Sequence, residues 1–301
     1  MVDQKLKLFC LIAEHESFSK AGEMIGMSQP GVSRQVRALE DTYGAKLFKR
    51  SGGRVMLTEA GERLHKYAGK INAHFSTAKN EINSFIDPSI EFITIGSCHI
   101  MGNYVLPDYI AQFNRNHKDI KIKLIIDGSR NILDAVSEKR IDFGVIEGKG
   151  RGSKLVAKKF CSDRIVVILP PHHKWSKRKK LSALDVLKEP TILRERGCRE
   201  REILETCLLK HGIQLEESKA VFVTATTESV KNAVESGIGL SFASQWAVQK
   251  ECSSGRLKQA LLKENDGYQE YSLVHRKNGG YSPSSATFLK YLDDNPVNVL
   301  C

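Results

Sequence analysis

The sequence predicts a multidomain α+β protein: a helical N-terminal domain, one long connecting helix and a C-terminal α/β domain. Three observations support this fold class. The first sixty residues read as short helices followed by a hairpin. Between residues 64 and 85, apolar side chains recur at alternating steps of four and three. After residue 92, strand-like and helix-like segments alternate. A chain of 301 residues has room for about two domains.

The composition is that of an ordinary globular protein, with 41% hydrophobic residues, 27% charged residues and a net charge of +11. No apolar run approaches the roughly 20 residues that a membrane span needs. The N-terminal segment carries glutamates and has no signal-peptide cleavage site, so we expect a cytoplasmic protein with no membrane partner. Residues 149–180 hold eleven basic residues and one acid, which predicts mainly a solvated basic surface.

The stretch 28–44 is predicted to be a helix with two different faces. Ser28 can cap its N-terminus, Pro30 suits the first turn, and Gly44 supplies a left-handed stop. One face is an apolar stripe of Val32, Val36, Leu39 and Tyr43, and the opposite face carries Gln29, Ser33, Arg34 and Arg37. Glutamine and arginine can bond to base edges in the major groove, and serine can reach a phosphate. A solvated surface helix would show the same face, so the flanking elements must decide.

Two shorter helices are predicted before this one, over 5–14 and 20–25. A tight turn with glycine at 26–28 joins the second of them to the helix over 28–44. A helix, a short helix, a three-residue turn and a polar-faced helix form the helix-turn-helix arrangement.

A β-hairpin is predicted after Gly44, because two short apolar runs flank Ser51-Gly52-Gly53. Its arms carry Arg50 and Arg54, which could lie over a phosphate backbone or a minor groove. Residues 1–58 are therefore predicted to form a winged helix-turn-helix domain that binds double-stranded DNA.

A linker helix is predicted over 59–88, capped by Thr58 and ended by Pro88. Its apolar positions are Leu64, Ala68, Ile71, Phe75, Ala78, Ile82 and Phe85. An unbroken heptad alternation is typical of a helix that pairs along a narrow seam. Packing on its own chain is the alternative. Because no second heptad helix exists in the chain, we expect this helix to form a homodimer.

The C-terminal two hundred residues predict an α/β domain with largely parallel sheets. The predicted strands are 92–96, 120–127, 141–146, 164–170, 191–194, 221–224 and 271–275, and the helices are 103–116, 130–140, 182–188, 199–211, 227–236 and 284–293. No glycine-rich nucleotide motif, nucleophile–base pair or metal-ligand spacing is found. The sequence therefore predicts no cofactor, no metal and no enzymatic activity.

Residues 6–71 resemble the N-terminal domain of the LysR-type transcriptional regulators. The matching segments are SFSKAGEMIGMSQPGVSRQVRALEDTYGAKLFKR and LTEAGERL. The resemblance implies a major-groove face and a DNA-binding wing on the residues Ser28, Gln29, Pro30, Ser33, Arg34, Arg50 and Arg54. Tetramers are common in this family, so a homotetramer is expected as well as the dimer.

The segments IDFGVIEG, RIVVILPPHHKW, TTESVKNAVESGIGLSFAS and SGRLKQALL resemble the effector domain of the same family. The resemblance implies that residues 89–301 form two α/β lobes similar to type 2 periplasmic binding proteins. The implied boundaries are about 89–162 and 268–301 for lobe I and about 163–267 for lobe II, with crossings near 162–165 and 265–270.

Ligands of such sheets bind at strand ends and helix N-termini, where free N–H groups favour anions. The candidate effector-binding residues are Ser97, Cys98, Ser129, Glu147, Gly197, Cys198 and Thr224. For each serine or threonine, helix capping is the alternative. We therefore expect a small anionic effector in the cleft, which regulates sequence-specific binding to promoter or operator DNA.

The seven cysteines form no CxxC pair, which predicts thiols instead of disulfides. At a helix start beside Arg199, Cys198 is expected to have a lowered pKa. Its spacing of nine residues to Cys207 is similar to that of the peroxide-sensing branch of the LysR family. A redox-responsive regulator using Cys198 is therefore one alternative function. A cytoplasmic solute-binding module without a DNA role is the other.

Overall fold

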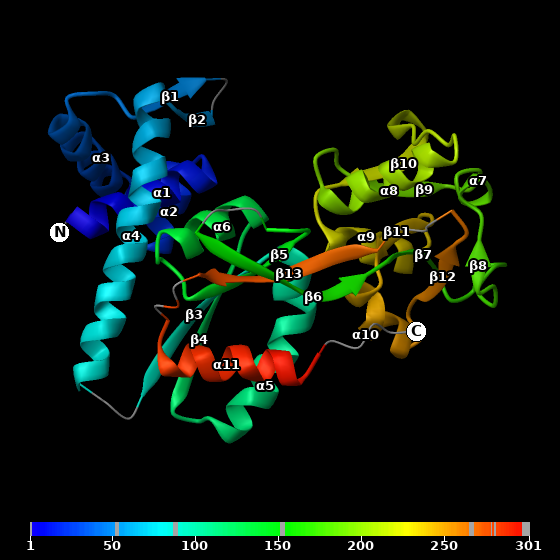
Figure 1. Ribbon diagram of the computed structural model, residues 1–301. Coiled ribbons are helices and arrows are strands. Elements are labelled where there is room, and N and C mark those ends of the chain that lie inside the picture. Colours follow the sequence, from blue (N-terminus) through cyan, green and yellow to red (C-terminus); the bar gives the residue numbers. More distant parts are fainter. Residues whose placement is uncertain are drawn as a thin grey trace. The chain divides into compact units, whose positions relative to one another are not determined.

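The computed structural model divides the chain into two compact units, Met1–Ile90 and Glu91–Cys301 (Figure 1). The residues that it describes are 2–51, 54–86, 90–150, 154–264, 268–277, 279 and 281–296. Within this described part, no helix is long and apolar enough to cross a membrane. The predicted α+β fold class is confirmed.

The N-terminal unit is a three-helix helix-turn-helix followed by a two-stranded wing and a long helix (Figure 1). Its elements are α1 (Val2–His15), α2 (Phe18–Met24), α3 (Gln29–Tyr43), β1 (Phe48–Ser51), β2 (Arg54–Leu57) and α4 (Glu59–Ile86). The two strands of the wing pair antiparallel. The hairpin tip at 52–53 and the predicted end of the linker helix at 87–89 lie outside the described residues.

Polar caps and one glycine set the limits of α3 and α4. Thr58 accepts the N–H of Gly61 at 3.0 Å, so it caps α4 as predicted. Gly44 ends α3 with a φ of 63°, the left-handed conformation that a residue with a Cβ adopts at a cost. Ser28 occupies the N-cap position of α3, but its hydroxyl bonds to no backbone N–H at the start of the helix.

The apolar stripe of α3 is buried, with one exception. Val32, Val36 and Leu39 lie in the core of the unit, whereas the prediction for Tyr43 is wrong, because its side chain is 48% exposed. The chain turns back at Gly44, and Glu40 is buried in place of Tyr43. The Glu40 carboxylate accepts a hydrogen bond from the N–H of Leu47 at 2.9 Å and pairs with the ammonium of Lys46 at 2.7 Å.

The first part of the predicted α4 seam belongs to the core of its own chain. Leu64 and Ala68 are buried, and Ile71 is partly buried, in one cluster with Leu6 and Phe9 of α1. The prediction that Leu64 and Ala68 pair with another subunit is therefore wrong. Both side chains are buried where α4 packs against α1.

The second part of the α4 seam is exposed. Phe75 is 51% exposed, Ile82 is 58% exposed, and Ala78 between them is exposed as well. The side chain of Phe85 lies outside the described part. Phe75 and Ile82 lie on one stripe of α4, and the described part of the chain does not cover the apolar surface that they form.

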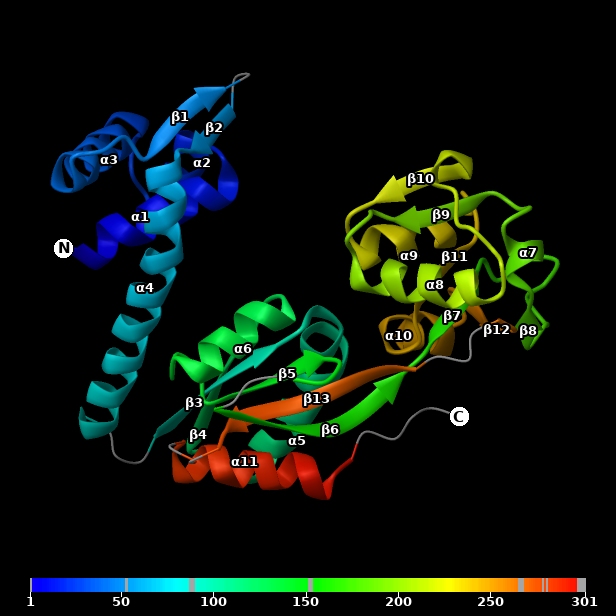
Figure 2. The same ribbon diagram turned by 45° about the horizontal axis from the view of Figure 1, so that its top comes forward.

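Lobe I of the C-terminal unit is a five-stranded sheet covered by helices on both faces (Figures 1 and 2). Its elements are β3 (Glu91–Ser97), the π-helix η1 (Met101–Val105), α5 (Leu106–Asn116), β4 (Ile120–Ile126), α6 (Ser129–Ser137), β5 (Phe143–Glu147), β6 (Leu155–Asp163), β13 (Gln269–Arg276) and α11 (Pro283–Asp294). The strand order is β4-β3-β5-β13-β6. Helices α5 and α11 pack on one face, and α6 packs on the other.

Lobe II contains a four-stranded sheet of order β11-β7-β12-β8 and a two-stranded sheet of β9 and β10. Its elements are β7 (Ile165–Leu169), β8 (Lys180–Leu181), α7 (Ala183–Val186), β9 (Thr191–Arg194), α8 (Arg199–Lys210), η2 (Glu217–Lys219), β10 (Ala220–Thr224), α9 (Thr227–Glu235), β11 (Ser241–Ser244), η3 (Trp246–Val248), α10 (Gln249–Ser253) and β12 (Lys258–Leu262).

The chain leaves lobe I through β6 and returns through β13, and these two strands lie side by side in Figure 2. They pair antiparallel, with Asp163 opposite Gln269. Strand β13 also runs antiparallel to β5, and β11 and β12 run antiparallel to β7. The prediction of largely parallel sheets is therefore wrong. Strand β13 re-enters lobe I from lobe II at the end where β6 leaves it, so it runs antiparallel to both β6 and β5.

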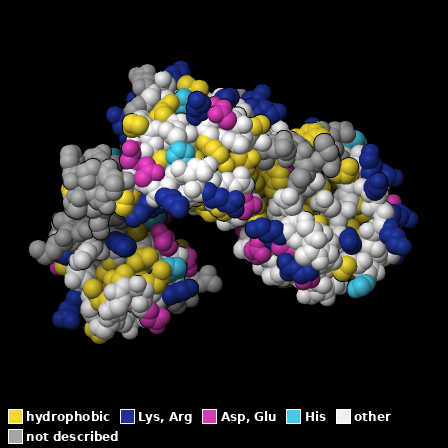
Figure 3. All heavy atoms as spheres, turned by 90° about the horizontal axis from the view of Figure 1, so that it is seen from below, with side chains coloured by type: hydrophobic (Ala, Val, Ile, Leu, Met, Phe, Trp, Pro, Cys, Tyr) yellow, Lys and Arg dark blue, Asp and Glu magenta, His cyan; other side chains and the backbone are white. Residues whose placement is uncertain are grey.

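The basic run at 174–180 lies on the outer edge of lobe II, where Figure 3 shows Lys and Arg side chains gathered. Lys174 pairs with Glu189 at 2.5 Å, and its ammonium lies 5.1 Å from the centre of the Trp175 ring. The four residues 177–180 are all exposed. Charges at an exposed sheet edge such as β8 also discourage pairing with a foreign strand.

Candidate functional site

The polar face of α3 is open to solvent. Gln29, Arg34 and Arg37 are exposed and Ser33 is half-buried. Neither arginine forms an ion pair or a hydrogen bond with any residue that the structure describes. Pro30 lies in the first turn of the helix, so its missing N–H removes no helical hydrogen bond. The unpaired guanidinium groups are therefore available to the edge of a base pair or to a phosphate.

The wing holds Arg50 and Arg54 near its end. Arg50 pairs with Val55 and Ser51 pairs with Arg54 in the β1–β2 ladder, so both arginines lie within the last two rungs. Their side chains are outside the described part of the chain. The backbone of the wing is consistent with the DNA-binding role predicted for these residues, which stays a prediction.

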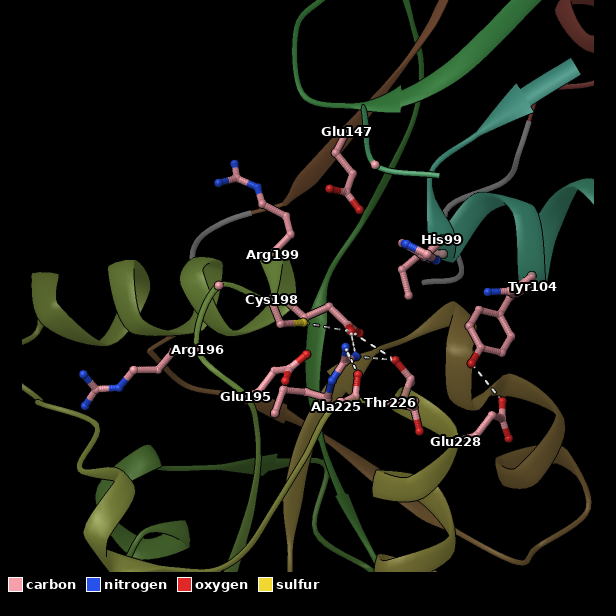
Figure 4. Close-up of a pocket in the computed structure, with 17 residues that line it drawn as sticks. His99, Tyr104, Glu147, Glu195, Arg196, Cys198, Arg199, Ala225, Thr226 and Glu228 are labelled. Atoms are coloured by element: carbon pink, nitrogen blue, oxygen red, sulfur yellow. Dashed lines mark hydrogen bonds and ion pairs between the residues drawn. The ribbon is translucent and has the colours of Figure 1, made fainter. Parts of the chain in front are cut away.

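A cavity of about 730 Å³ lies between the lobes of the C-terminal unit (Figure 4). Lobe I contributes His99, Ile100, Asn103, Tyr104, Gly128 and Glu147, and lobe II contributes residues 194–200 and 225–228. The cavity volume is in the range of small-molecule sites.

Four helical segments begin at this cleft. One starts at His99 after β3, and the others are α6, α8 and α9. The N–H groups of a first helical turn have no intrahelical acceptor, and the helix dipole adds partial positive charge there. At α9, one of these N–H groups, that of Ser229, is already bonded to Thr226 at 3.1 Å. The cleft therefore favours an anionic group near its helix starts.

Three of the seven predicted effector residues line the cleft, namely Glu147, Gly197 and Cys198. The other four are Ser97, Cys98, Ser129 and Thr224, and the lining does not include them. Ser97 and Cys98 are buried in lobe I, and the Ser97 hydroxyl donates to the carbonyl of Cys98. The Ser129 hydroxyl accepts the N–H of Glu147 at 3.0 Å. The predictions for these four residues miss the lining by one or two positions, because the neighbouring residues His99, Gly128 and Ala225 reach the cavity instead.

The pair Tyr104 and Glu228 was not predicted from the sequence, and it joins the two lobes at the cleft wall. The Tyr104 hydroxyl donates to a Glu228 oxygen at 2.8 Å (Figure 4). Burial and this carboxylate raise the pKa of Tyr104. Lys231, which is buried, pairs with Glu228 at 2.7 Å and lies 4.9 Å from the centre of the Tyr104 ring. Nothing in the sequence singles out Tyr104, because it reads as one residue inside a helix.

Arg194 and Glu200 form the central ion pair of the lobe II wall, at 2.8 Å and largely buried. The Arg194 guanidinium also donates to the Thr227 hydroxyl at 2.6 Å and to the Ala225 carbonyl at 2.8 Å. The other oxygen of Glu200 accepts the N–H of Ser244 at 3.2 Å. This network joins β9, α8, α9 and β11. The guanidinium of Arg194 is therefore already bonded within lobe II and stabilises this wall of the cleft.

Cys198 does not have the lowered pKa that its place at a helix start predicts. Burial raises the pKa of this thiol, and the Glu200 carboxylate raises it further, while Arg194 acts in the opposite direction. The thiol lies 3.8 Å from a Glu200 oxygen. The prediction of thiolate character is therefore wrong, because burial of the thiol and the nearby Glu200 carboxylate both disfavour the charged form.

Asp163, at the first crossing between the lobes, is a buried carboxyl with few partners. It is 3% exposed, accepts the N–H of Arg164 at 2.8 Å and accepts a hydrogen bond from the Ser244 hydroxyl. Burial raises its pKa to about 6, and the Glu200 carboxylate adds to the rise, although the hydrogen bonds from Ser244, Arg164 and Trp246 act to lower it. An ionised Asp163 is therefore disfavoured inside the fold.

Replacing Asp163 with asparagine is expected to stabilise the chain at neutral pH by up to about 3 kcal/mol. The folded pKa lies above the unfolded value of about 3.9, so wild-type stability falls as pH rises from about 4 to about 6 and stays reduced above that. The gain in melting temperature over wild type should therefore be absent near pH 4 and full at pH 7. A gain that is equal at both pH values would contradict the assignment.

Both domains of the chain match known protein families. Residues 92–296 match the family described as the LysR substrate binding domain, and residues 4–62 match the bacterial regulatory helix-turn-helix protein, lysR family. The chain is 27% identical to the RuBisCO operon transcriptional regulator of Allochromatium vinosum over 99% of this chain and 97% of that protein. It is 28% identical to the HTH-type transcriptional regulator CysL of Bacillus subtilis (strain 168), over 82% of this chain and 81% of that protein.

The fold is also similar to that of solved structures. Full-length CbnR complexed with its target DNA superposes with a TM-score of 0.69 at 16% identity, covering 98% of this chain and 99% of that one. This similarity extends over the winged helix-turn-helix, the long helix and the two-lobed domain.

Proposed function

The chain belongs to the LysR family of DNA-binding transcriptional regulators, and on this basis we propose how it recognises DNA and what controls it. Two copies hold a roughly palindromic operator in the cytoplasm, each placing α3 in the major groove and its wing beside the phosphate backbone. A small molecule in the cleft of the C-terminal unit controls this binding. The protein acts as a regulator and not as an enzyme.

The observation that carries the DNA-binding proposal is the exposed polar face of α3. Gln29, Arg34 and Arg37 project from one helix without partners among the described residues, in a domain that matches the family of regulatory helix-turn-helix proteins. Arginine and glutamine are the side chains that bond guanine and adenine with two hydrogen bonds. A solute-binding module without a DNA role would not explain this exposed face of α3.

Self-association is proposed on two surfaces. The exposed Phe75 and Ile82 of α4 are the contact that forms the dimer, which sets two recognition helices about one DNA turn, ~34 Å, apart. The second surface consists of edge strands of the C-terminal unit. Strand β10 exposes Val221, Phe222 and Val223 at the edge of its sheet, and β4 is an edge strand of lobe I. We propose that these edges pair between dimers to form a homotetramer.

The effector is proposed to be a small molecule with an anionic group bound at the helix starts of the cleft. Four helical segments begin there, which supports an anion as the bound group. A ligand that contacts both lobes binds one relative arrangement of the lobes better than others and so shifts their population. The shift changes the spacing of the DNA-binding heads.

Fluorescence anisotropy of the full chain with DNA tests the proposal. Binding to the operator is expected to exceed binding to scrambled DNA by at least about a thousandfold and to weaken steeply as salt rises. The absence of any salt-dependent DNA binding would refute the proposed regulator.

A redox-responsive regulator that uses Cys198 is the second candidate. The family spacing to Cys207 favours it, but the geometry does not. Cys207 is buried and its thiol donates to the Glu264 carbonyl at 3.2 Å. The helical rise over nine residues separates the Cα atoms of Cys198 and Cys207 by about 13.5 Å, whereas the Cα atoms of a disulfide lie about 4.4–6.8 Å apart. A disulfide between them would require α8 to unwind.

Replacing Cys198 with serine is therefore expected to leave DNA binding unchanged, both before and after treatment of the full chain with hydrogen peroxide. The reason is the raised pKa of the Cys198 thiol, which keeps the reactive thiolate scarce. Operator affinity in a gel shift measures the effect. If peroxide alters the affinity of the wild type and not that of the variant, the redox function replaces the effector function.

A further inference from the structure

The arginines of the cleft are already neutralised by carboxylates of the same lobe. The pairs are Arg194–Glu200 at 2.8 Å, Arg196–Glu217 at 3.2 Å and Arg199–Glu202 at 3.1 Å. Figure 4 shows Arg196 pointing away from the cavity. No arginine that lines the cleft is therefore left without a carboxylate partner for an anionic ligand.

The glutamates of the cleft are not balanced in the same way. Glu200 is paired with Arg194, and Glu228 is paired with Lys231 at 2.7 Å. Glu147 and Glu195 form no ion pair with a residue that the structure describes, although Arg199 is near enough to act on the Glu147 carboxylate. The two unpaired carboxylates come from opposite lobes and both line the cavity. The described lining therefore has an excess of negative side chains.

Glu147 is the unpaired carboxylate that burial affects most. It ends β5, and its backbone N–H is bonded to the Ser129 hydroxyl, which fixes where the side chain starts. Figure 4 shows its carboxylate directed into the cavity, toward Cys198 and His99. Burial raises its pKa, with Arg199 acting to lower it and Glu200 to raise it. Burying a carboxylate without a partner costs free energy, which a cationic group in the cavity would offset.

We propose that the effector is a small zwitterion, whose amino group binds Glu147 while its anionic group binds at the starts of α8 and α9. This inference rests on the proposed effector function and names the class of ligand. An organic ammonium fits better than a metal ion. No group of three or more histidine, cysteine or acidic side chains in the described part of the chain could hold a metal.

Saturation-transfer NMR on the full chain, with ethylammonium and acetate as separate probes at constant ionic strength, tests the proposal. Each ion represents one end of the zwitterion. Ethylammonium is expected to bind the wild type, and Glu147→Gln is expected to weaken this binding by about tenfold, the value of one charge-assisted hydrogen bond. Glu216→Gln is the matched control. Glu216 is partly exposed and pairs with Lys219 outside the cleft, so its loss should leave the ethylammonium signal unchanged.

The folding of the variant is checked in the same samples. Glu147→Gln keeps the shape of the side chain and removes an unpaired buried charge, so its melting temperature without ligand should equal or exceed that of the wild type. Acetate binding by this variant should match the wild type. Ethylammonium should also remain bound when acetate is saturating, because the two groups have separate subsites.

The outcomes separate this inference from the effector function on which it rests. Acetate binding without ethylammonium binding would overturn the zwitterion and leave an anionic effector in place. Ethylammonium binding that survives in Glu147→Gln, or that acetate abolishes, would overturn it as well. If neither ion binds the wild type, the zwitterion and the effector site fail together.

Discussion

Replacing Arg34 with alanine is expected to reduce the preference for operator over scrambled DNA by about tenfold to a hundredfold. Arg34 is exposed on α3 and has no partner among the described residues, so its guanidinium is free to make two hydrogen bonds to one base. Its loss removes base readout, while the fold keeps the buried Val32 and Val36. The ratio of the two dissociation constants, from competition anisotropy, measures the effect.

Arg34→Lys is the control that separates base readout from charge. Lysine keeps the positive charge but not the planar fork of donors. We therefore expect it to retain the slope of affinity against salt and to lose most of the preference for the operator. If Arg34→Ala weakened operator and scrambled DNA equally, the residue would be a phosphate contact, and the base-reading role would pass to Gln29 or Arg37.

The helices of the N-terminal unit were predictable from local patterns. The cap at Thr58, the stop at Gly44 and the buried stripe of Val32, Val36 and Leu39 follow from residue type and spacing. Tyr43 is an exception to these local patterns. Spacing alone predicts that the apolar stripe continues to the end of α3, but the Tyr43 side chain is exposed. The tertiary turn toward Leu47 makes Glu40, whose carboxylate is satisfied there, the buried residue.

The position of the cleft was predictable from the sequence, but most of the side chains that line it were not. Strand ends located it to within two residues, and Glu147, Gly197 and Cys198 do line it. Which side chain reaches the cavity depends on the twist of each strand end and on hydrogen bonds made elsewhere. Ser129 is an example, because its hydroxyl accepts the N–H of Glu147. The pairing of polar side chains could not be predicted, since partners such as Tyr104 and Glu228 are far apart in sequence.

Strand β6 was missed because its sequence hides its pattern. Lys158 and Lys159 are consecutive and exposed, so no alternation of apolar and polar residues is visible in the middle of the strand. The strand is stabilised by its long antiparallel pairing with β13, a partner that arrives more than a hundred residues later. Because this pairing cannot be inferred from the local sequence, the pattern of the basic segment indicates a solvated loop.

Replacing both Phe75 and Ile82 with glutamate is expected to abolish the dimer contact through α4. Both side chains are more than half exposed within the chain, so the substitutions leave its own core intact. Leu64 and Ala68 are unsuitable targets, since they pack against α1 and their loss would unfold the domain. Two facing pairs of glutamates would add like charges to a seam that is dry in the dimer.

Sedimentation velocity measures the expected change, and Lys66→Glu is the matched control. Lys66 is exposed on the opposite side of α4, and its replacement alters the net charge by as much as the double substitution does. The control is expected to stay a dimer. A monomer has one recognition helix in place of two and loses the gain from binding both half-sites at once, about a hundredfold or more in operator affinity. A double variant that remains a dimer with full operator affinity would mean that the exposed stripe of α4 has another partner.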